Sequence, residues 1–299
     1  MRQGLDRRAL LRALATLPVP WASPGFAMAG PASRLVALDL LATELLLTLG
    51  VTPAGIANRS LYERLVAAPA LPAAVADLGP LTEPNAEFLK MLKPEIIVLA
   101  AWQGDMLARL AAIAPFHMLA AAPRDVPATA HLAALLDGLG ALTGRAGEAR
   151  QWLGRMEDVL SAAKIALSAR RIRPLYVCRF AANGRNVAIF GGNGLIGDVL
   201  RRLGLENAWQ GRTNAAGVAS IGIEQLKHPD AHIVHFDRGA ETVRALENLA
   251  QSPLWQALPA VRQARVTTMR VIYPSGGVAS AIRFAEQLVA TLPVNEIRS

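Results

Sequence analysis

Apolar side chains between Thr143 and Arg173 recur at the i, i+3, i+4, i+7 spacing that forms one face of an α-helix. The stretch contains no proline before Pro174, where a helix must stop, and Thr143 is a candidate N-cap. Arginines at its C-terminal end are well placed to complement the helix dipole. The pattern therefore predicts one amphipathic helix of roughly 25 residues, about 38 Å long.

On both sides of this helix, short continuous apolar runs alternate with segments of helical periodicity, which is the pattern of an α/β fold. The predicted strands are residues 34–38, 51–57, 95–100, 174–178, 186–190, 231–236 and 266–269. The predicted helices are residues 42–49, 86–92, 191–204, 224–227 and 276–292, and residues 58–81 are predicted to be a long loop. We expect two α/β lobes, residues 30–142 and 174–299, joined by a single long α-helix, residues 143–173, with a ligand cleft between the lobes.

Two segments of the first lobe have counterparts in the second. Glu44–Val51 matches Asp198–Leu205 in its acid, leucines and glycine, and Glu87–Lys90 resembles Glu224–Lys227, each of which precedes a proline and an apolar strand. These matches indicate two diverged copies of one α/β unit. Glu87 and Glu224 would then lie in the first turns of equivalent helices. There they either complement the helix dipole or form a pair of exposed acids, one per lobe, that a basic partner binds.

The first 29 residues have the pattern of a secretory signal peptide: a basic start, a short apolar stretch and small residues before the expected cleavage site. Asp6-Arg7-Arg8 resembles the start of a twin-arginine export motif. Residues 1–29 are therefore predicted to be removed on export. The expected location is the periplasm of a Gram-negative bacterium.

The charge and cysteine content limit the possible partners and covalent links of the chain. Removing the four arginines and one aspartate of the signal segment lowers the formal net charge from +8 to +5, and the remaining charge is spread along the chain. Nucleic-acid binding needs a clustered basic stripe, so no nucleic-acid partner is expected. Cys178 is the only cysteine, which excludes an intrachain disulfide. We expect a monomer that does not span the membrane.

Catalytic and metal-binding signatures are missing from the chain. The turn Gly191–Gly194 lacks the spacing of a phosphate-binding loop, and neither a hydrolase nor a metalloprotease motif is present. His232 and His235 lie three apart in a strand pattern, which places them on opposite faces. We therefore expect no enzyme activity, no catalytic residue, no protein-bound metal and no cofactor.

Two of the scarce aromatic residues and one arginine follow predicted strands at their C-terminal ends. They are Trp102, Arg179 and Tyr273. In open α/β sheets, ligands bind outside these ends, so the three side chains are candidates for the wall of the cleft.

Several segments together resemble the periplasmic ferric hydroxamate siderophore-binding proteins of ATP-binding-cassette (ABC) iron uptake. The segments are residues 34–50, 71–72, 77–79, 82–85, 91–94, 203–211 and 252–259. The resemblance runs through the whole mature chain in order. It implies two lobes joined by a rigid helix, a shallow cleft, capture of an iron(III)–siderophore complex, and delivery to an inner-membrane ABC permease and its ATPase. It also implies that Glu87 and Glu224 dock to arginines of the permease.

The same resemblance assigns ligand-binding positions, and several of them differ from the pattern of the family. Where hydroxamate-binding members have an arginine before the Thr-Glu-Pro turn, this chain has Leu81. The tyrosine position after strand 95–100 falls at Trp102 or Gln103, a tryptophan position falls at Ala216, and a late aromatic pair becomes Tyr273 and Ser275.

The candidate replacement cations are Arg59, Arg179, Arg185 and Arg270. The expected ligand is therefore a different siderophore, such as an anionic, citrate-based hydroxamate. Haem or cobalamin binding by the same fold, and a secreted α/β enzyme, are the alternatives.

Overall fold

The computed structural model describes residues 34–123 and 125–292. The predicted signal peptide, residues 1–29, lies outside these ranges. None of the helices in the described ranges is both long and apolar enough to cross a membrane.

The N-terminal lobe is built on a parallel five-stranded sheet with strand order β3-β2-β1-β4-β5. Its strands are β1 (Leu35–Ala37), β2 (Gly55–Ile56), β3 (Ala76–Asp77), β4 (Ile96–Ala100) and β5 (Phe116–Leu119). Its helices are α2 (Leu40–Thr48), α3 (Arg59–Leu65) and α4 (Ala86–Leu92), with 3-10 turns η1 (Ala101–Gln103) and η2 (Ala108–Ala112). The central strand β1 is wholly apolar because helices and loops cover both faces of the sheet.

The segment 58–81 is not the long loop that the sequence predicted. It contains α3 and β3. The Asn58 side chain accepts a hydrogen bond from the Leu61 backbone N–H at 3.1 Å and so caps α3, while Tyr62 on the same helix is fully buried.

The C-terminal lobe contains a mixed five-stranded sheet of order β10-β9-β6-β7-β8, in which β6, β9 and β10 run parallel and β7 and β8 antiparallel. Its strands are β6 (Leu175–Phe180), β7 (Asn186–Phe190), β8 (Val218–Gly222), β9 (His232–Asp237) and β10 (Val266–Arg270). Its helices are α7 (Leu195–Arg202), η3 (Ile223–Gln225), α8 (Ala240–Ala250), α9 (Pro253–Ala257), α10 (Pro259–Arg262) and α11 (Val278–Thr291).

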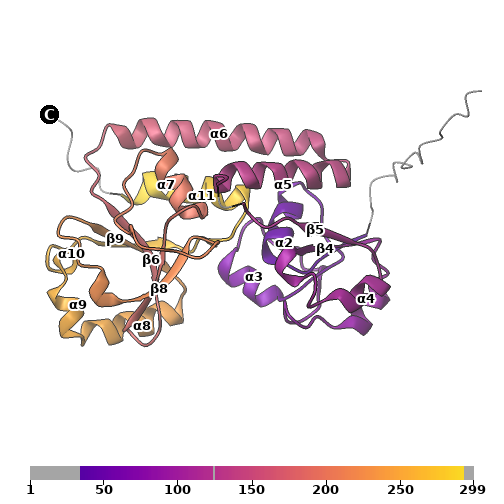
Figure 1. The fold of residues 1–299 in the computed structure, drawn as a ribbon, viewed down its shortest axis with the longest axis horizontal. Helices are drawn as coiled ribbons and strands as arrows, with labels where there is room; N and C mark the ends of the chain where they lie inside the picture. The colour runs from indigo at the N-terminus through magenta and orange to yellow at the C-terminus, as the bar shows by residue number, and fades with distance from the viewer. Residues whose placement is uncertain (1–33, 124, 293–299) are drawn as a thin grey trace, which may run out of the picture. The chain divides into compact units, whose positions relative to one another are not determined.

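The lobes are joined by a helical hairpin, α5 (Ala128–Thr143) and α6 (Ala146–Ser168) (Figure 1). The long helix α6 is shorter than the predicted 143–173, because Thr143 ends α5 and Gly144 adopts a left-handed conformation, φ 70°, after it. The hairpin is tight: a Cβ on Gly140 would lie 2.9 Å from the Cβ of Ala149. Arg170 donates to the carbonyls of Val289 and Leu292, so it binds the end of α11 rather than that of its own helix.

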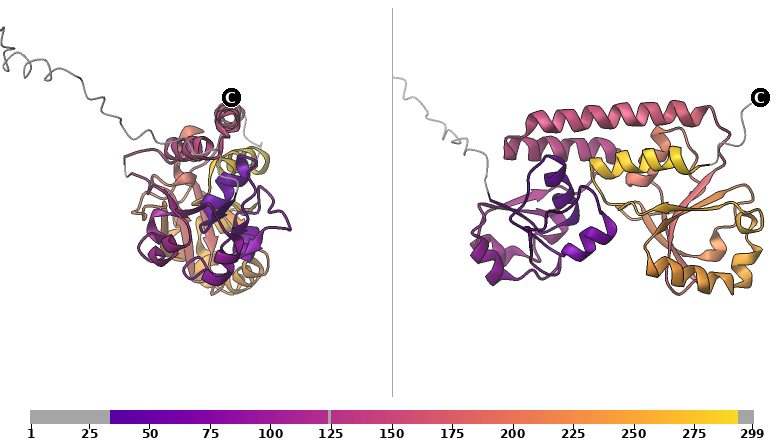
Figure 2. Two further views of the ribbon diagram at one scale, coloured as in Figure 1. Left: turned by 90° about the vertical axis from the view of Figure 1, so that its right-hand side faces the viewer. Right: turned by 180° about the vertical axis from the view of Figure 1, so that it is seen from behind.

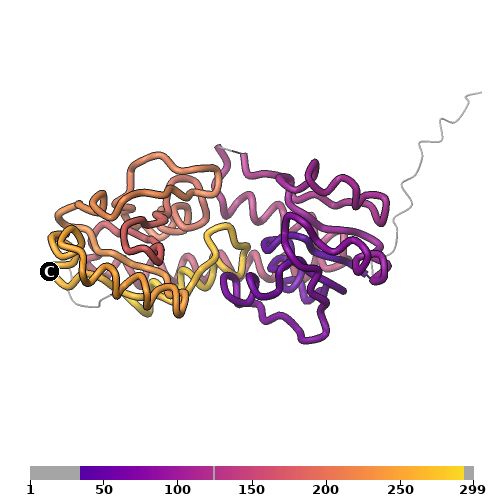
Figure 3. Tube along the Cα trace, turned by 90° about the horizontal axis from the view of Figure 1, so that it is seen from below, coloured from indigo at the N-terminus to yellow at the C-terminus, as the bar shows by residue number. Residues whose placement is uncertain are grey.

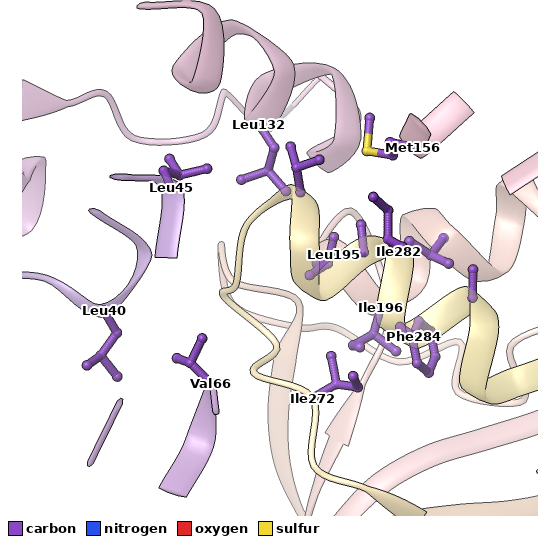
Figure 4. Close-up of a cluster of buried hydrophobic side chains, with 14 of the residues drawn as sticks. Leu40, Leu45, Val66, Leu132, Met156, Leu195, Ile196, Ile272, Ile282 and Phe284 are labelled. Carbon is purple, nitrogen blue, oxygen red and sulfur yellow. The ribbon is translucent and has the colours of Figure 1, made fainter. Parts of the chain in front are cut away.

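One layer of helices connects the two lobes, since α6 packs against α5, α7 and α11 (Figure 2). The buried stripe of α6 is Ala149, Met156, Leu160, Ala163 and Leu167, as its periodicity predicted. The core beneath it contains side chains from both lobes, including Leu45, Leu132, Leu195 and Phe284 (Figure 4). The lobes therefore share one hydrophobic core near the hairpin.

Two buried acids each cap a helix of the opposite lobe, where α5 is counted as the last helix of the N-terminal lobe. Glu44 on α2 accepts hydrogen bonds from the backbone N–H groups of Gly277 (2.9 Å) and Ser280 (2.8 Å) and from the Ser280 hydroxyl, at the start of α11. Asp198 on α7 accepts hydrogen bonds from the Thr129 backbone N–H (2.7 Å) and hydroxyl (2.8 Å) at the start of α5. Both acids are fully buried. They are the same two acids that the internal sequence match aligns.

Candidate ligand-binding site

A cavity of about 300 Å³ lies between the lobes. Its walls come from the carboxyl ends of β1, β4 and β5, from the start of α5, and from the loops that follow β7, precede β8 and follow β10. Figure 3, seen from below, shows the segment from β10 to α11 lying between the two lobes. The site therefore lies where parallel α/β sheets bind their ligands, and its mostly apolar, alanine-rich lining is typical of a small-molecule pocket.

Four residues that the sequence analysis assigned to the ligand line this cavity. They are Trp102, Ala216, Tyr273 and Ser275. Trp102 extends from the η1 turn after β4, is 53% exposed, and is positioned for contact with a bound molecule. Ala216 provides space where an aromatic side chain would fill the pocket.

Asp39 is a lining residue that the sequence analysis missed. It follows β1 and caps α2, and its carboxylate accepts from the backbone N–H of Leu41 at 2.8 Å. Burial raises the pKa of Asp39, although hydrogen bonds from backbone N–H groups and from the Trp102 side chain oppose this shift. The N-terminal wall of the cavity therefore presents an acceptor group.

Tyr273 faces the cavity from the opposite lobe. Burial raises its pKa to about 12, and the nearby negative charge of Asp39 acts in the same direction, while a hydrogen bond with Ser275 and the positive charge of Arg179 oppose it. The phenol is therefore neutral at physiological pH and is available as a hydrogen-bond donor.

Gln103 and Leu81, also assigned to the ligand by the sequence analysis, do not line the cavity. The Gln103 amide is fully buried; it donates to the carbonyls of Leu38 (2.7 Å) and Leu81 (2.9 Å), and its oxygen accepts from the Ala100 N–H at 3.0 Å. These bonds hold together the strand ends that form the N-terminal wall. The Leu81 side chain is half-buried against the apolar cores of the N-terminal lobe.

None of the four candidate arginines is among the residues that line the cavity. Arg59 and Arg185 are occupied or exposed elsewhere. The Arg59 guanidinium donates to the Glu63 carboxylate at 3.0 Å and to the carbonyls of Pro72, Ala73 and Val75, so it fastens the segment between α3 and β3. Arg185 lies exposed in the turn between β6 and β7.

Arg179 is half-buried near the carboxyl end of β6, and Arg238 directly follows β9, the neighbouring parallel strand. Burial lowers the pKa of Arg179, and the positive charge of Arg238 lowers it further, so the two guanidinium groups interact. Arg238 forms an ion pair of 2.6 Å with Glu241, and its side chain is 16% exposed. Arg238 was not among the residues predicted from the sequence.

Glu87 and Glu224 are both exposed, one on each lobe. Glu87 lies in the first turn of α4, with its side chain 81% exposed and an ion pair of 2.8 Å to Lys90. Glu224 lies in the 3-10 turn η3 rather than in the short α-helix predicted for 224–227.

Two buried histidines of β9 form hydrogen bonds with side chains of the neighbouring strand β10. The ring of His232 hydrogen-bonds Thr267 (2.6 Å), and that of His235 hydrogen-bonds Thr268 (2.9 Å). Burial lowers the pKa of both rings. In residues 34–123 and 125–292, histidine, cysteine and acidic side chains form no group of three or more that could hold a metal ion.

The two lobes, the connecting helix and the cavity between the strand ends define a class of protein. Residues 35–273 match the family described as "Periplasmic binding protein", and this chain belongs to it. Members of this family are substrate-binding proteins.

Comparison with individual proteins shows which members of the family this chain resembles. The chain is 34% identical over 289 residues to the iron(3+)-hydroxamate-binding protein FhuD of Escherichia coli (strain K12), covering 95% of each chain. The crystal structure of the siderophore-binding protein FhuD from Vibrio cholerae with bound Fe³⁺–Desferal is similar at a TM-score of 0.80 and 31% identity, over 87% of this chain and 97% of that one. These similarities confirm the family resemblance predicted from the sequence.

The fold is shared more widely than the sequence. The triscatecholate siderophore-binding protein FeuA of Bacillus subtilis, complexed with ferri-bacillibactin, matches at a TM-score of 0.67 and 20% identity, over 88% of this chain and 94% of that one. At this identity the likeness concerns the fold alone.

Proposed function

We propose that this protein is a periplasmic solute-binding protein that captures an iron(III)–siderophore complex and delivers it to an inner-membrane ABC permease. The observation that carries the proposal is the inter-lobe cavity in a chain whose whole length is similar to an iron(3+)-hydroxamate-binding protein. The N-terminal segment with signal-peptide features supports a periplasmic location.

The composition of the cavity suits a preformed metal chelate. Its apolar lining contacts the hydrocarbon part of the ligand, while Tyr273, Ser275 and Asp39 supply a few polar groups that fix orientation. The siderophore itself supplies the ligands of Fe³⁺. The protein therefore has no need to coordinate the iron and acts as a binding surface without catalysis.

Delivery requires a second surface. Glu87 and Glu224 support it, because each is exposed and each lobe contributes one. Two acids whose separation is set by the core that the lobes share would bind two basic pockets on the permease.

A fluorescence titration tests the proposal. Purified residues 30–299 are titrated with Fe³⁺ chelates of the hydroxamate, citrate–hydroxamate and catecholate classes, and the quenching of tryptophan emission is followed. At least one ferric chelate is expected to bind at micromolar or lower concentration, and its iron-free form more weakly. Failure of every iron chelate to bind would refute the proposal, and a new Soret band on mixing with haem would replace it with haem transport.

A further inference from the structure

We propose that the C-terminal lobe has a second binding site, for a small oxyanion such as phosphate or a carboxylate, outside the cleft that the proposed function uses. The site is a cavity of about 390 Å³ beside α7, a size that admits a small molecule. Its lining residues are Gly192, Asn193, Gly197, Arg201, Leu205, Asn207, Trp209, Gln210 and Gly211. All of them belong to the C-terminal lobe, and Asn193 is the one that also lines the cavity between the lobes.

A cation lines this second cavity. Among the described residues, Arg201 is the charged one in its lining. Nη2 of Arg201 donates to Oδ1 of the buried Asp198 at 2.5 Å, while the Arg201 side chain is 52% exposed. Within the described part of the chain, Nε and Nη1 of Arg201 form no hydrogen bond or ion pair. A guanidinium already fixed by one bond loses little further freedom when its remaining donors bind an anion.

The carboxylate that fixes Arg201 is engaged elsewhere as well. Asp198 accepts two hydrogen bonds from Thr129, at the start of α5, in addition to the one from Arg201. Its negative charge is therefore shared among three donors, and the exposed part of the guanidinium keeps a positive charge for a ligand.

The indole of Trp209 supplies a second donor. Its Nε1 is buried and has no hydrogen-bond partner. A Cβ on Gly211 would lie 2.8 Å from Cε2 of the indole, and one on Gly191 would lie 3.6 Å from Cδ1. Since Nε1 is bonded to both of these ring atoms, it lies between two glycine turns that contribute Gly192 and Gly211 to the cavity wall. A buried indole N–H usually has an acceptor, so an unpaired one beside a cavity indicates a ligand that supplies it.

Neighbouring amides shape the wall through bonds within the protein. Nδ2 of Asn207 donates to the carbonyl of Phe190 at 3.0 Å, and its Oδ1 accepts from the Trp209 backbone N–H at 2.9 Å. Gln210 donates to the carbonyl of Asn207 at 2.5 Å. The guanidinium and the indole N–H stay unpaired, and both are donors that cannot accept. A ligand with acceptor oxygens and a negative charge satisfies both, as carboxylates and phosphates do.

Calorimetric titration of residues 30–299 with inorganic phosphate and with citrate, at constant ionic strength, tests the site. At least one of the two anions is expected to bind with one-to-one stoichiometry. Arg201→Gln should weaken this binding at least about tenfold, as expected for loss of a charge-assisted hydrogen bond. Arg201→Lys should recover part of the affinity, because it keeps the charge. The matched control is Arg244→Gln, exposed on α8 of the same lobe, which should change the affinity less than about twofold.

Tryptophan fluorescence distinguishes this site from the cleft. Trp209 lines the second cavity and Trp102 lines the first. Trp209→Phe keeps an aromatic ring and removes the N–H, so it should weaken anion binding by about three- to tenfold and abolish the fluorescence change that the anion causes. Trp102→Phe should preserve that change. This variant pair also keeps the test decisive if loss of the bond to Asp198 prevents Arg201→Gln from folding.

Three results would overturn the inference. They are a wild type that binds neither anion saturably, a folded Arg201→Gln variant that binds the anion as tightly as the wild type, and an anion response that Trp102→Phe removes and Trp209→Phe preserves. The proposed function is tested separately, because Arg201→Gln should leave the affinity for a ferric chelate within about twofold.

Discussion

The reciprocal caps between the lobes provide the sharpest test of how this fold is held together. Neither α5 nor α11 has a capping side chain of its own, since their N-cap residues are Pro127 and Gly277 and neither forms a side-chain cap hydrogen bond. Each helix instead receives a carboxylate from the opposite lobe, Asp198 in one case and Glu44 in the other. Replacing either acid by alanine therefore removes a helix cap and a link between the lobes in one step.

The size of the effect follows from the bonds that are lost. Glu44→Ala leaves two backbone N–H groups and one hydroxyl without their acceptor in a buried site. Loss of an N-cap costs about 0.5–2 kcal/mol, and each buried donor left unpaired costs about 1–3 kcal/mol. Burial raises the pKa of Glu44, because desolvation disfavours its charged form. This cost offsets part of the stability that its hydrogen bonds contribute. We expect a net loss of about 2–4 kcal/mol in the free energy of unfolding.

Thermal unfolding followed by far-ultraviolet circular dichroism measures this loss. For a chain of this size the expected fall in Tm is about 5–10 °C for Glu44→Ala, and Asp198→Ala should give a similar value. The matched control is Glu148→Ala, which removes an acid from the first turn of α6 that forms a 2.7 Å surface ion pair with Arg145. Exposed pairs of this kind contribute little to stability, because solvent screens them. If Glu44→Ala lowers Tm no more than Glu148→Ala does, the caps do not hold the lobes together.

Three further predictions concern the surface, the cavity and pH. Exchanging Glu87 and Glu224 together for alanine should leave siderophore affinity within about twofold and reduce uptake in cells at least about tenfold, whereas the exposed Glu247→Ala should alter neither. Trp102→Phe should remove most of the ligand-induced fluorescence quenching, because Trp102 is the indole that lines the cavity within the described residues; unchanged quenching would place the ligand elsewhere. All three tyrosines have raised pKa values, that of Tyr273 to about 12, so phenolate absorbance at 295 nm should stay low at pH 10 in the folded protein. A tyrosine whose pKa is raised by folding stabilises the fold below its unfolded pKa of about 10, and this contribution should be lost as the pH rises through about 12. Half-titration of the tyrosines at pH 10 in the native protein would contradict the burial of these phenols.

Seven of the ten strands in the described residues were predicted from the sequence, because a strand buried on both faces is a continuous apolar run. The short β3 and the partly exposed β5 and β8 lack such a run and were missed. Residues 186–190 and 266–269 agree with β7 and β10 to within one residue. Helix α5 was missed for a physical reason. Its sequence combines alanines with Gly138 and Gly140, which have weak helix propensity and blur the polar face. Tertiary contacts stabilise it instead, including the cap from Asp198 and close packing on α6.

The site was predictable only in part. Trp102 and Tyr273 both follow strands and both line the cavity, since strand ends converge in this class of fold. Gln103, one residue along, is turned into the lobe by three hydrogen bonds that no sequence pattern reveals. Asp39 lies two residues after β1 and lines the cavity, and the same rule applied to every strand would have found it.

The internal repeat acquires a physical meaning from the caps. From the sequence, the alignment of Glu44 with Asp198 was evidence of two related units and nothing more. In the structure, each acid lies on the equivalent helix of its own unit and caps the last helix of the other, so a single interaction inherited twice becomes a reciprocal clamp. Because the two clamps share no residue, their losses in the Glu44→Ala, Asp198→Ala double variant should add to within about 0.5 kcal/mol. A marked shortfall would mean that breaking one clamp already releases the other, and that the two lobes are held by one cooperative contact rather than two.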